Sequence, residues 1–155
     1  MAIASLPGAK LDTARRLSVA DSFVELSGTQ PEPALDEIRK THTRGFDIVV
    51  EATGVPKVLE ASLTFVRRGG KLAVFGVYSS EARVSWQPSK ILCNQISIIG
   101  SIAEVIRFPA AVDYLDSKRI RVDGIANKTF RLEQWGKCLE SLKMGGTVKA
   151  AIVFD

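Results

Sequence analysis

Short apolar runs alternate along this chain with helix-forming segments, and residues 45–77 give the clearest example. Ile48–Val50 is a short apolar run, which is typical of a strand buried on both faces. Gly54 permits a sharp turn, and Pro56 suits the first turn of a helix. A second apolar strand follows this helix and ends at Gly76. The pattern therefore predicts a strand, a helical crossover and a second strand.

The end of this helix is predicted from its last charged and small residues. Arg67 and Arg68 suit the C-terminal end of a helix dipole, and Gly69 and Gly70 follow directly. We therefore expect the helix to run to Arg68 and to stop at the glycines.

The same pattern continues on both sides of this segment. Alternating strands and helices predict a mostly parallel sheet with right-handed crossovers. Up to residue 115 the expected order is βαβαβαββα, and a final strand, helix and strand look like an appended unit. Further strands are expected at 1–5, 22–26, 82–86 (an edge strand), 96–99 and 148–154, and further helices at 9–17, 33–41, 88–93, 109–115 and 133–144.

Composition narrows the class of protein. The chain has 155 residues, with 46% hydrophobic and 25% charged, as in an ordinary globular domain. Its net charge of +4 is mildly basic, but the basic residues are scattered and lack interleaved aromatic residues. We expect no nucleic-acid partner. No signal peptide or apolar run of ~20 residues is visible, so we expect no membrane association and a cytoplasmic location.

Cysteine and histidine are too few for a metal site, and no nucleophile–base pair or paired carboxylates indicate a catalytic centre. Cys93, Cys138 and His42 are the only residues of these types, whereas a zinc site needs three or four ligands. We expect no zinc in this chain and no catalytic residue. The cysteines are interpreted as small core residues, and His42 as a surface residue at a helix end.

A series of short motifs occurs in order between Phe46 and Ser117, within a likeness that extends from Ile3 to Phe154. In that order they resemble the C-terminal portion of zinc-dependent medium-chain alcohol and polyol dehydrogenases, in particular fungal arabinitol and sorbitol-type enzymes. The motifs are Phe46–Gly54, Arg68-Gly69-Gly70, Gly76-Val77, Ser89-Lys90, Ile96–Ser101, Phe108-Pro109 and Tyr114–Ser117.

This resemblance implies an α/β fold and its division. A complete family member has a catalytic domain that holds zinc, then a six-stranded Rossmann domain that opens with Gly-x-Gly-x-x-Gly. Neither part is recognisable here. The expected fold is an incomplete Rossmann-like, mostly parallel sheet flanked by helices, without the first strand and its glycine-rich turn. Residues 1–125 would be the truncated dinucleotide-binding domain, and 126–155 the closing segment that completes the catalytic domain.

The resemblance also implies which residues would contact a bound NADP or NAD. In the family, the nicotinamide and its ribose lie over the ends of strands four, five and six. Small residues and backbone groups there let the cofactor approach closely. The alternative is that these glycines only end strands. The matching positions are Ala52, Thr53, Phe75, Gly76, Val77, Ile98, Ile99, Gly100 and Ser101.

The other cofactor contacts are implied near the two ends of the chain. Ser5 matches the position of the family's acid that binds the adenosine 2′-hydroxyl, and Lys10 lies nearby. A missing acid and a nearby cation favour NADP over NAD; an error in the matched register would remove that preference. Lys149 resembles a basic residue that reaches the pyrophosphate, and a solvated surface lysine explains it equally well.

Several functions remain open. Without the glycine-rich turn, most of the anchor for the dinucleotide is absent. Without zinc, the Lewis acid is absent as well. We expect a truncated NAD(P)-dependent alcohol or polyol dehydrogenase, an oxidoreductase by descent, with little or no activity alone. The alternatives are a non-enzymatic interaction or regulatory module and a piece of an incompletely predicted gene.

The resemblance finally predicts two strand pairings. In the family's strand order, the missing strand separates the strands that match Met1–Ser5 and Ile48–Val50. We expect these segments to pair directly, or the first to fray and leave 46–101 as the ordered core, because unpaired buried backbone groups are costly. The edge at Ala82–Trp86 is expected to form a homodimer or to pair with a full-length relative.

Overall fold

The computed structural model describes residues 1–28, 31–102 and 107–154, which form two compact units. The described residues from 36 to 102 make up the central unit, and the remaining described residues make up the terminal unit. Within the described residues, no helix combines the length and the apolar character that a membrane crossing requires.

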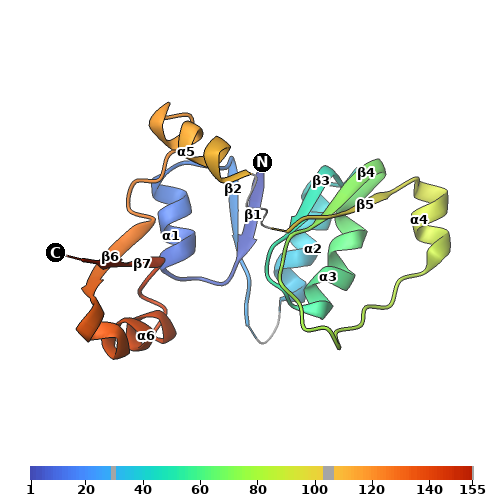
Figure 1. Cartoon of the computed structure of the whole chain (residues 1–155). Coiled ribbons are helices and arrows are strands. Elements are labelled where there is room, and N and C mark those ends of the chain that lie inside the picture. The colour runs from blue at the N-terminus through green and yellow to red at the C-terminus, as the bar shows by residue number, and fades with distance from the viewer. Residues whose placement is uncertain (29–30, 103–106, 155) are drawn as a thin grey trace. The chain divides into compact units, whose positions relative to one another are not determined.

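The central unit is built on a three-stranded parallel sheet in the order β3-β4-β5 (Figure 1). β3 (Phe46–Glu51) pairs with β4 (Val66–Val74), which pairs with β5 (Ser97–Gly100). The associated helices are α2 (Glu32–Thr41), α3 (Pro56–Ser62) and α4 (Pro88–Asn94). The structure thus confirms the α/β fold with parallel strands and flanking helices.

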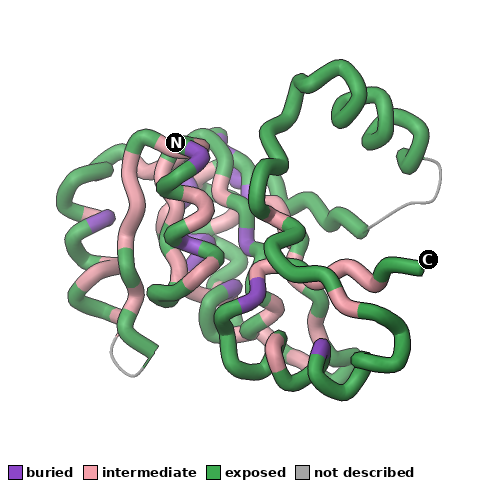
Figure 2. Tube along the Cα trace, turned by 90° about the vertical axis from the view of Figure 1, so that its left-hand side faces the viewer, coloured by how far each residue is buried: buried purple, intermediate pink, exposed green. Residues whose placement is uncertain are grey.

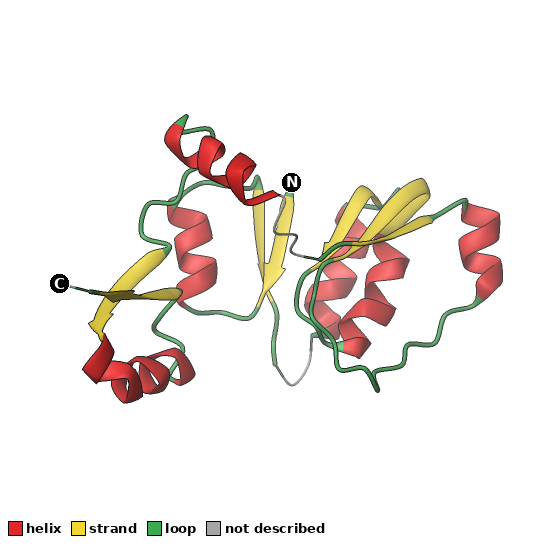
Figure 3. Ribbon diagram, in the orientation of Figure 1, coloured by secondary structure: helices red, strands yellow, loops and turns green. Residues whose placement is uncertain are grey.

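One face of this sheet carries the core. Leu72, in the middle of β4, is 0% exposed. Figure 3 shows α2 and α3 on one side of the sheet, and the buried side chains lie between α3 and the strands. The buried cluster consists of Leu59, Leu63, Val66, Leu72 and Ile96.

The opposite face of the sheet is open in this structure. Ile48 and Val50 are each 60% exposed, and Figure 2 shows how little of the trace is buried. The expectation that Ile48–Val50 is buried on both faces is therefore wrong. An apolar run reports hydrophobicity but not which elements cover it, and α3 packs on the Val49 side alone.

α3 also ends earlier than the sequence predicts. It stops at Ser62, a 3-10 turn covers Leu63–Phe65, and Arg67 to Gly70 belong to β4. Leu63 and Val66 are buried, so the chain leaves the helix to place them in the core. The glycines then form an irregularity in the strand, where the register shifts between Phe46 and Ile48.

Residues 82–86, which the sequence predicts to be an edge strand, form no strand and have an irregular backbone. Glu60 holds this segment through one backbone and one side-chain donor. The Ser85 N–H donates to the Glu60 carboxylate at 2.6 Å, and the Trp86 indole donates to the Glu60 carbonyl at 3.4 Å. These bonds direct the segment against α3 and not into a strand ladder. The strand–helix order up to α5 is therefore βαβαβαβαβα.

In the terminal unit, β1 (Ala2–Ser5), α1 (Ala9–Arg16) and β2 (Ser22–Glu25) form a parallel strand–helix–strand motif. Leu11 of α1 is 1% exposed and anchors this helix. The expectation that Met1–Ser5 pairs with Ile48–Val50, or frays, is wrong. β1 forms its ladder with β2, because the short α1 crossover brings these neighbouring strands together.

The last part of the chain contains the expected strand, helix and strand. α5 (Phe108–Asp116) precedes β6 (Ala126–Arg131), α6 (Trp135–Lys143) and β7 (Lys149–Val153), and β6 pairs with β7 in parallel. The appended strand–helix–strand unit is therefore confirmed. Its assignment as a separate closing segment, 126–155, stays a prediction.

Candidate functional site

The residues that follow β3 and β4, together with the end of β5, meet at one edge of the central sheet. The Phe75 N–H donates to the Glu51 carbonyl at 2.8 Å, and the Ser101 N–H donates to the Val74 carbonyl at 3.0 Å. These bonds join the three strand ends, because parallel strands finish at the same edge. Most of the predicted cofactor contacts are thereby brought together: Ala52, Thr53, Phe75, Gly76, Val77, Ile98, Ile99, Gly100 and Ser101.

Glu51 is the structural centre of this edge. It is only 2% exposed. Its carboxylate accepts hydrogen bonds from the Thr53 N–H at 2.6 Å, from the Thr53 hydroxyl and from the Tyr78 hydroxyl. The Gly54 N–H lies 3.5 Å from the same carboxylate. Buried carboxyl oxygens need hydrogen-bond partners, and these partners come from both loops, so Glu51 ties the loop after β3 to the loop after β4.

Two glycines allow these loops to approach each other. Gly54 has φ +76°, and a Cβ there would lie 2.3 Å from the Val77 carbonyl oxygen. A Cβ on Gly76 would lie 2.4 Å from the Gly54 nitrogen and 2.6 Å from the Glu51 carboxylate. Both positions therefore require glycine for the close packing of these two loops.

The outer surface of the same edge is apolar and accessible. Phe75 is 55% exposed, Val77 is 90% exposed and Ile99 is 46% exposed. A Cβ on Gly100 would find open space. The edge thus offers apolar side chains beside uncovered backbone, a combination that suits a flat ring carrying polar substituents.

The remaining predicted contacts belong to the terminal unit. Ser5 is the last residue of β1 and is paired in register with Glu25 of β2. Lys10 is exposed on α1, and Lys149 is the exposed first residue of β7. Their approach to a cofactor stays a prediction.

The histidine and the two cysteines are not among the residues that meet at this edge. His42 is exposed and stacks on Phe46, as a surface residue would. Cys138 is buried, as expected, but Cys93 is exposed, so its interpretation as a core residue is wrong; it lies near the end of α4, which contributes no buried residue. Across residues 1–28, 31–102 and 107–154, no group of at least three His, Cys, Asp or Glu side chains is placed to hold a metal.

Sequence reasoning missed Glu51 and Tyr78. A carboxylate directly after the apolar run of β3 was the available signal, because an acid at the end of a buried strand needs hydrogen-bond donors. Tyr78 lies 27 residues further along the chain, and only the fold brings its hydroxyl to Glu51.

Removing the acceptor at Glu51 is expected to loosen this edge. Glu51→Gln replaces one carboxylate oxygen with an NH₂ group, so a hydrogen-bond donor faces other donors. We expect a loss of about 1–3 kcal/mol in the free energy of unfolding, and about 0.5–1.5 kcal/mol for Tyr78→Phe. Urea denaturation followed by circular dichroism measures both; equal stability of Glu51→Gln and the unsubstituted chain would contradict this role.

Comparison with known proteins gives consistent relationships. A family model described as zinc-binding dehydrogenase matches residues 2–117. D-arabinitol dehydrogenase 1 of Uromyces fabae is 38% identical over 150 residues, which cover 97% of this chain and 43% of that protein. Sorbitol dehydrogenase of Bacillus subtilis (strain 168) is 27% identical over 139 residues, covering 89% of this chain and 38% of that protein. The chain thus spans less than half the length of these relatives.

Solved structures share the fold at lower sequence identity. A protein of Escherichia coli CFT073 described as a short chain alcohol dehydrogenase, solved with NADH, superposes with a TM-score of 0.84 at 18% identity, covering 99% of this chain and 44% of that one. A protein of Sinorhizobium meliloti 1021 described as a zinc-binding dehydrogenase, solved bound to NADP, superposes with a TM-score of 0.84 at 19% identity, covering 99% of this chain and 44% of that one. These likenesses support the Rossmann-like fold.

Proposed function

Because this chain belongs to the zinc-binding dehydrogenase family, we propose that it carries the nicotinamide-side half of an NAD(P) site. The observation that supports this proposal is the edge held by Glu51, where nine of the twelve predicted cofactor contacts meet. When bound, a nicotinamide cofactor supplies hydride transfer. The chain's own residues would position its ring.

Each part of the edge has a role in this proposal. Phe75, Val77 and Ile99 would contact the ring and exclude water from it, because they are apolar and exposed. The open backbone at Gly100 would let the cofactor approach. Glu51 would act indirectly by holding Thr53 in place.

We propose that this half-site alone gives little or no dehydrogenase activity. The sequence contains no Gly-x-Gly-x-x-Gly turn to bind the pyrophosphate, and its single histidine and two cysteines fall short of a zinc ligand set. Zinc therefore does not fit the described residues. The relatives named above favour alcohols and polyols as the ancestral substrates.

NADP is proposed as the preferred cofactor, on the basis of Ser5 and Lys10. We also propose a cytoplasmic location, supported by two cysteines without a disulfide between them.

Ligand-observed NMR and calorimetry test the half-site. With NADP or NAD, magnetisation transfer from the protein is expected to reach the nicotinamide protons. Calorimetry should show no saturable binding at micromolar cofactor concentrations. NADP should give the stronger signal, and Lys10→Gln should remove the difference from NAD. Micromolar affinity would contradict the weak anchoring. No transfer to the nicotinamide, with the chain folded by circular dichroism, would contradict the half-site.

A second candidate function is a non-enzymatic interaction module. The supporting observation is that β5 is an outermost strand of the central sheet, with one side unpaired, and all its residues are exposed. Pairing at a sheet edge, in a homodimer or with a full-length relative, is therefore proposed near β5, since 82–86 forms no strand. Light scattering that shows a stable monomer at high concentration would exclude the homodimer, and co-purification with a full-length dehydrogenase would favour the second partner.

A further inference from the structure

A basic cleft lies in the central unit away from the proposed cofactor edge. Its volume is about 780 Å³. It is lined by Gly45, Val66 and Ile96, which precede or begin β3, β4 and β5, whereas the cofactor edge lies where these strands end. Six residues of β3 correspond to a length of roughly 20 Å. The cleft is therefore a separate feature at the opposite edge of the sheet.

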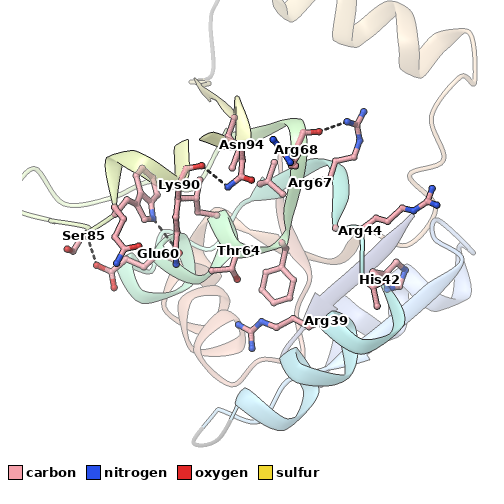
Figure 4. A pocket seen from close by; sticks show the side chains of 18 residues that line it. Arg39, His42, Arg44, Glu60, Thr64, Arg67, Arg68, Ser85, Lys90 and Asn94 are labelled. Atoms are coloured by element: carbon pink, nitrogen blue, oxygen red, sulfur yellow. Dashed lines mark hydrogen bonds between the residues drawn. The ribbon is translucent and has the colours of Figure 1, made fainter. Parts of the chain in front are cut away.

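The charged residues that line this cleft are mostly basic. The positive side chains come from different elements, as Figure 4 shows. Glu60 is the acid in the lining, and its carboxylate already accepts the Ser85 N–H at 2.6 Å. The chain as a whole has 21 basic and 17 acidic residues, so composition alone does not produce this imbalance. The basic lining residues are Arg39, Arg44, Arg67, Arg68 and Lys90.

Some of these cations have carboxylate partners outside the cleft. Arg39 pairs with Asp36 at 2.6 Å, and Arg67 pairs with Asp47 at 2.6 Å. Arg39 also lies over the Phe65 ring, 4.8 Å from its centre. These contacts hold the two arginines in fixed positions and reduce their contribution to binding a ligand.

The other cations lack such a partner. Within the described parts of the chain, Arg44, Arg68 and Lys90 form no ion pair. Arg68 donates to the Cys93 carbonyl at 3.4 Å, which leaves its other N–H groups available. Asn94 is half-buried and donates to the Lys90 carbonyl at 2.9 Å, which ties Lys90 into α4. A concave surface concentrates the field of such charges and raises the local concentration of anions.

We propose that this cleft binds an anion with adjacent phosphate groups. Guanidinium and ammonium groups are the side chains that bind phosphate oxygens through charge-assisted hydrogen bonds. Arg68 on β4, Lys90 on α4 and Arg44 in the loop before β3 line the same cleft. An anion with more than one phosphate group carries enough charge and enough oxygens to interact with several of them. The volume is within the range of small-molecule sites.

Titration of the folded chain with inorganic pyrophosphate tests this site. We expect saturable one-to-one binding by calorimetry, with NMR shifts at the Gly45 amide and the Trp86 indole N–H. Arg68→Gln with Lys90→Gln should weaken binding about tenfold or more, because two charge-assisted contacts are lost. Arg44→Gln alone provides a second variant in case the double variant does not fold.

A matched control distinguishes binding at this cleft from a general effect of the positive charge of the chain. Lys57→Gln with Arg83→Gln removes the same charge from the same unit, at residues that do not line the cleft. This control should change the affinity by less than about twofold, since exposed charges at a distance are screened. Equal weakening by both double variants, or no saturable binding, would overturn the proposal.

Discussion

Replacing Gly54 with alanine is expected to destabilise the central unit by about 2–4 kcal/mol and to disrupt the proposed nicotinamide edge. Gly54 has φ +76°, a conformation that costs an L-residue roughly 1–2 kcal/mol. The added Cβ would also lie 2.3 Å from the Val77 carbonyl oxygen. Because that neighbour is backbone, relief requires the two loops to move apart, and the Glu51 contacts would be lost with them.

Urea denaturation of Gly54→Ala measures the stability change, and NMR shifts at Thr53 and Val77 report the displacement of the loops. Gly100→Ala is the matched control, because a Cβ there meets nothing within 4 Å. It should change stability by less than about 1 kcal/mol. If Gly54→Ala were as stable as Gly100→Ala, the close packing of the loops after β3 and β4 would be disproved.

Leu72→Ala is the second change with a large expected effect. Leu72 is 0% exposed in the middle strand of the central sheet, within the buried cluster. Truncating a fully buried leucine leaves a cavity and costs about 2–5 kcal/mol. The buried cluster contains few residues, so we expect loss of hydrogen-exchange protection across β3, β4 and β5 together.

Val50→Ala is the control on the other face of the same sheet. Val50 is 60% exposed, so this change should cost less than about 1 kcal/mol. Hydrogen exchange and denaturation of the two variants therefore compare the faces directly. Equal losses for both variants would show that the Val50 face is also packed in solution, contrary to the structure.

The candidate site was predicted unevenly from the sequence, and the reason is physical. Positions such as Thr53, Gly76 and Gly100 follow or end apolar strands, and parallel strands end at a common edge, so their grouping follows from local pattern and fold class. Glu51 is different. Its importance depends on a hydroxyl contributed by Tyr78 and on the closeness of two glycine loops, neither of which leaves a periodic signal.

Tertiary contacts also explain two predictions that the structure shows to be wrong, the end of α3 and the strand at 82–86. The end of α3 was misplaced because Arg67 to Gly70 carry good helix-stop residues, yet burial of Leu63 and Val66 draws the chain into β4 earlier. The segment 82–86 alternates like a strand, but its Ser85 N–H donates to the Glu60 carboxylate and not to a neighbouring strand. In both places a tertiary contact outweighed a local preference.

Periodicity and the positions of glycine and proline were enough to predict the α/β alternation and the parallel strands, and the order of the motifs indicated the resemblance to the dehydrogenase family. These predictions rest on short segments of neighbouring residues. Only the tertiary structure decided that β1 pairs with β2, that Glu51 joins two loops, and that Arg44, Arg68 and Lys90 line one cleft. Each of these depends on residues far apart in the chain, whose meeting is determined by packing.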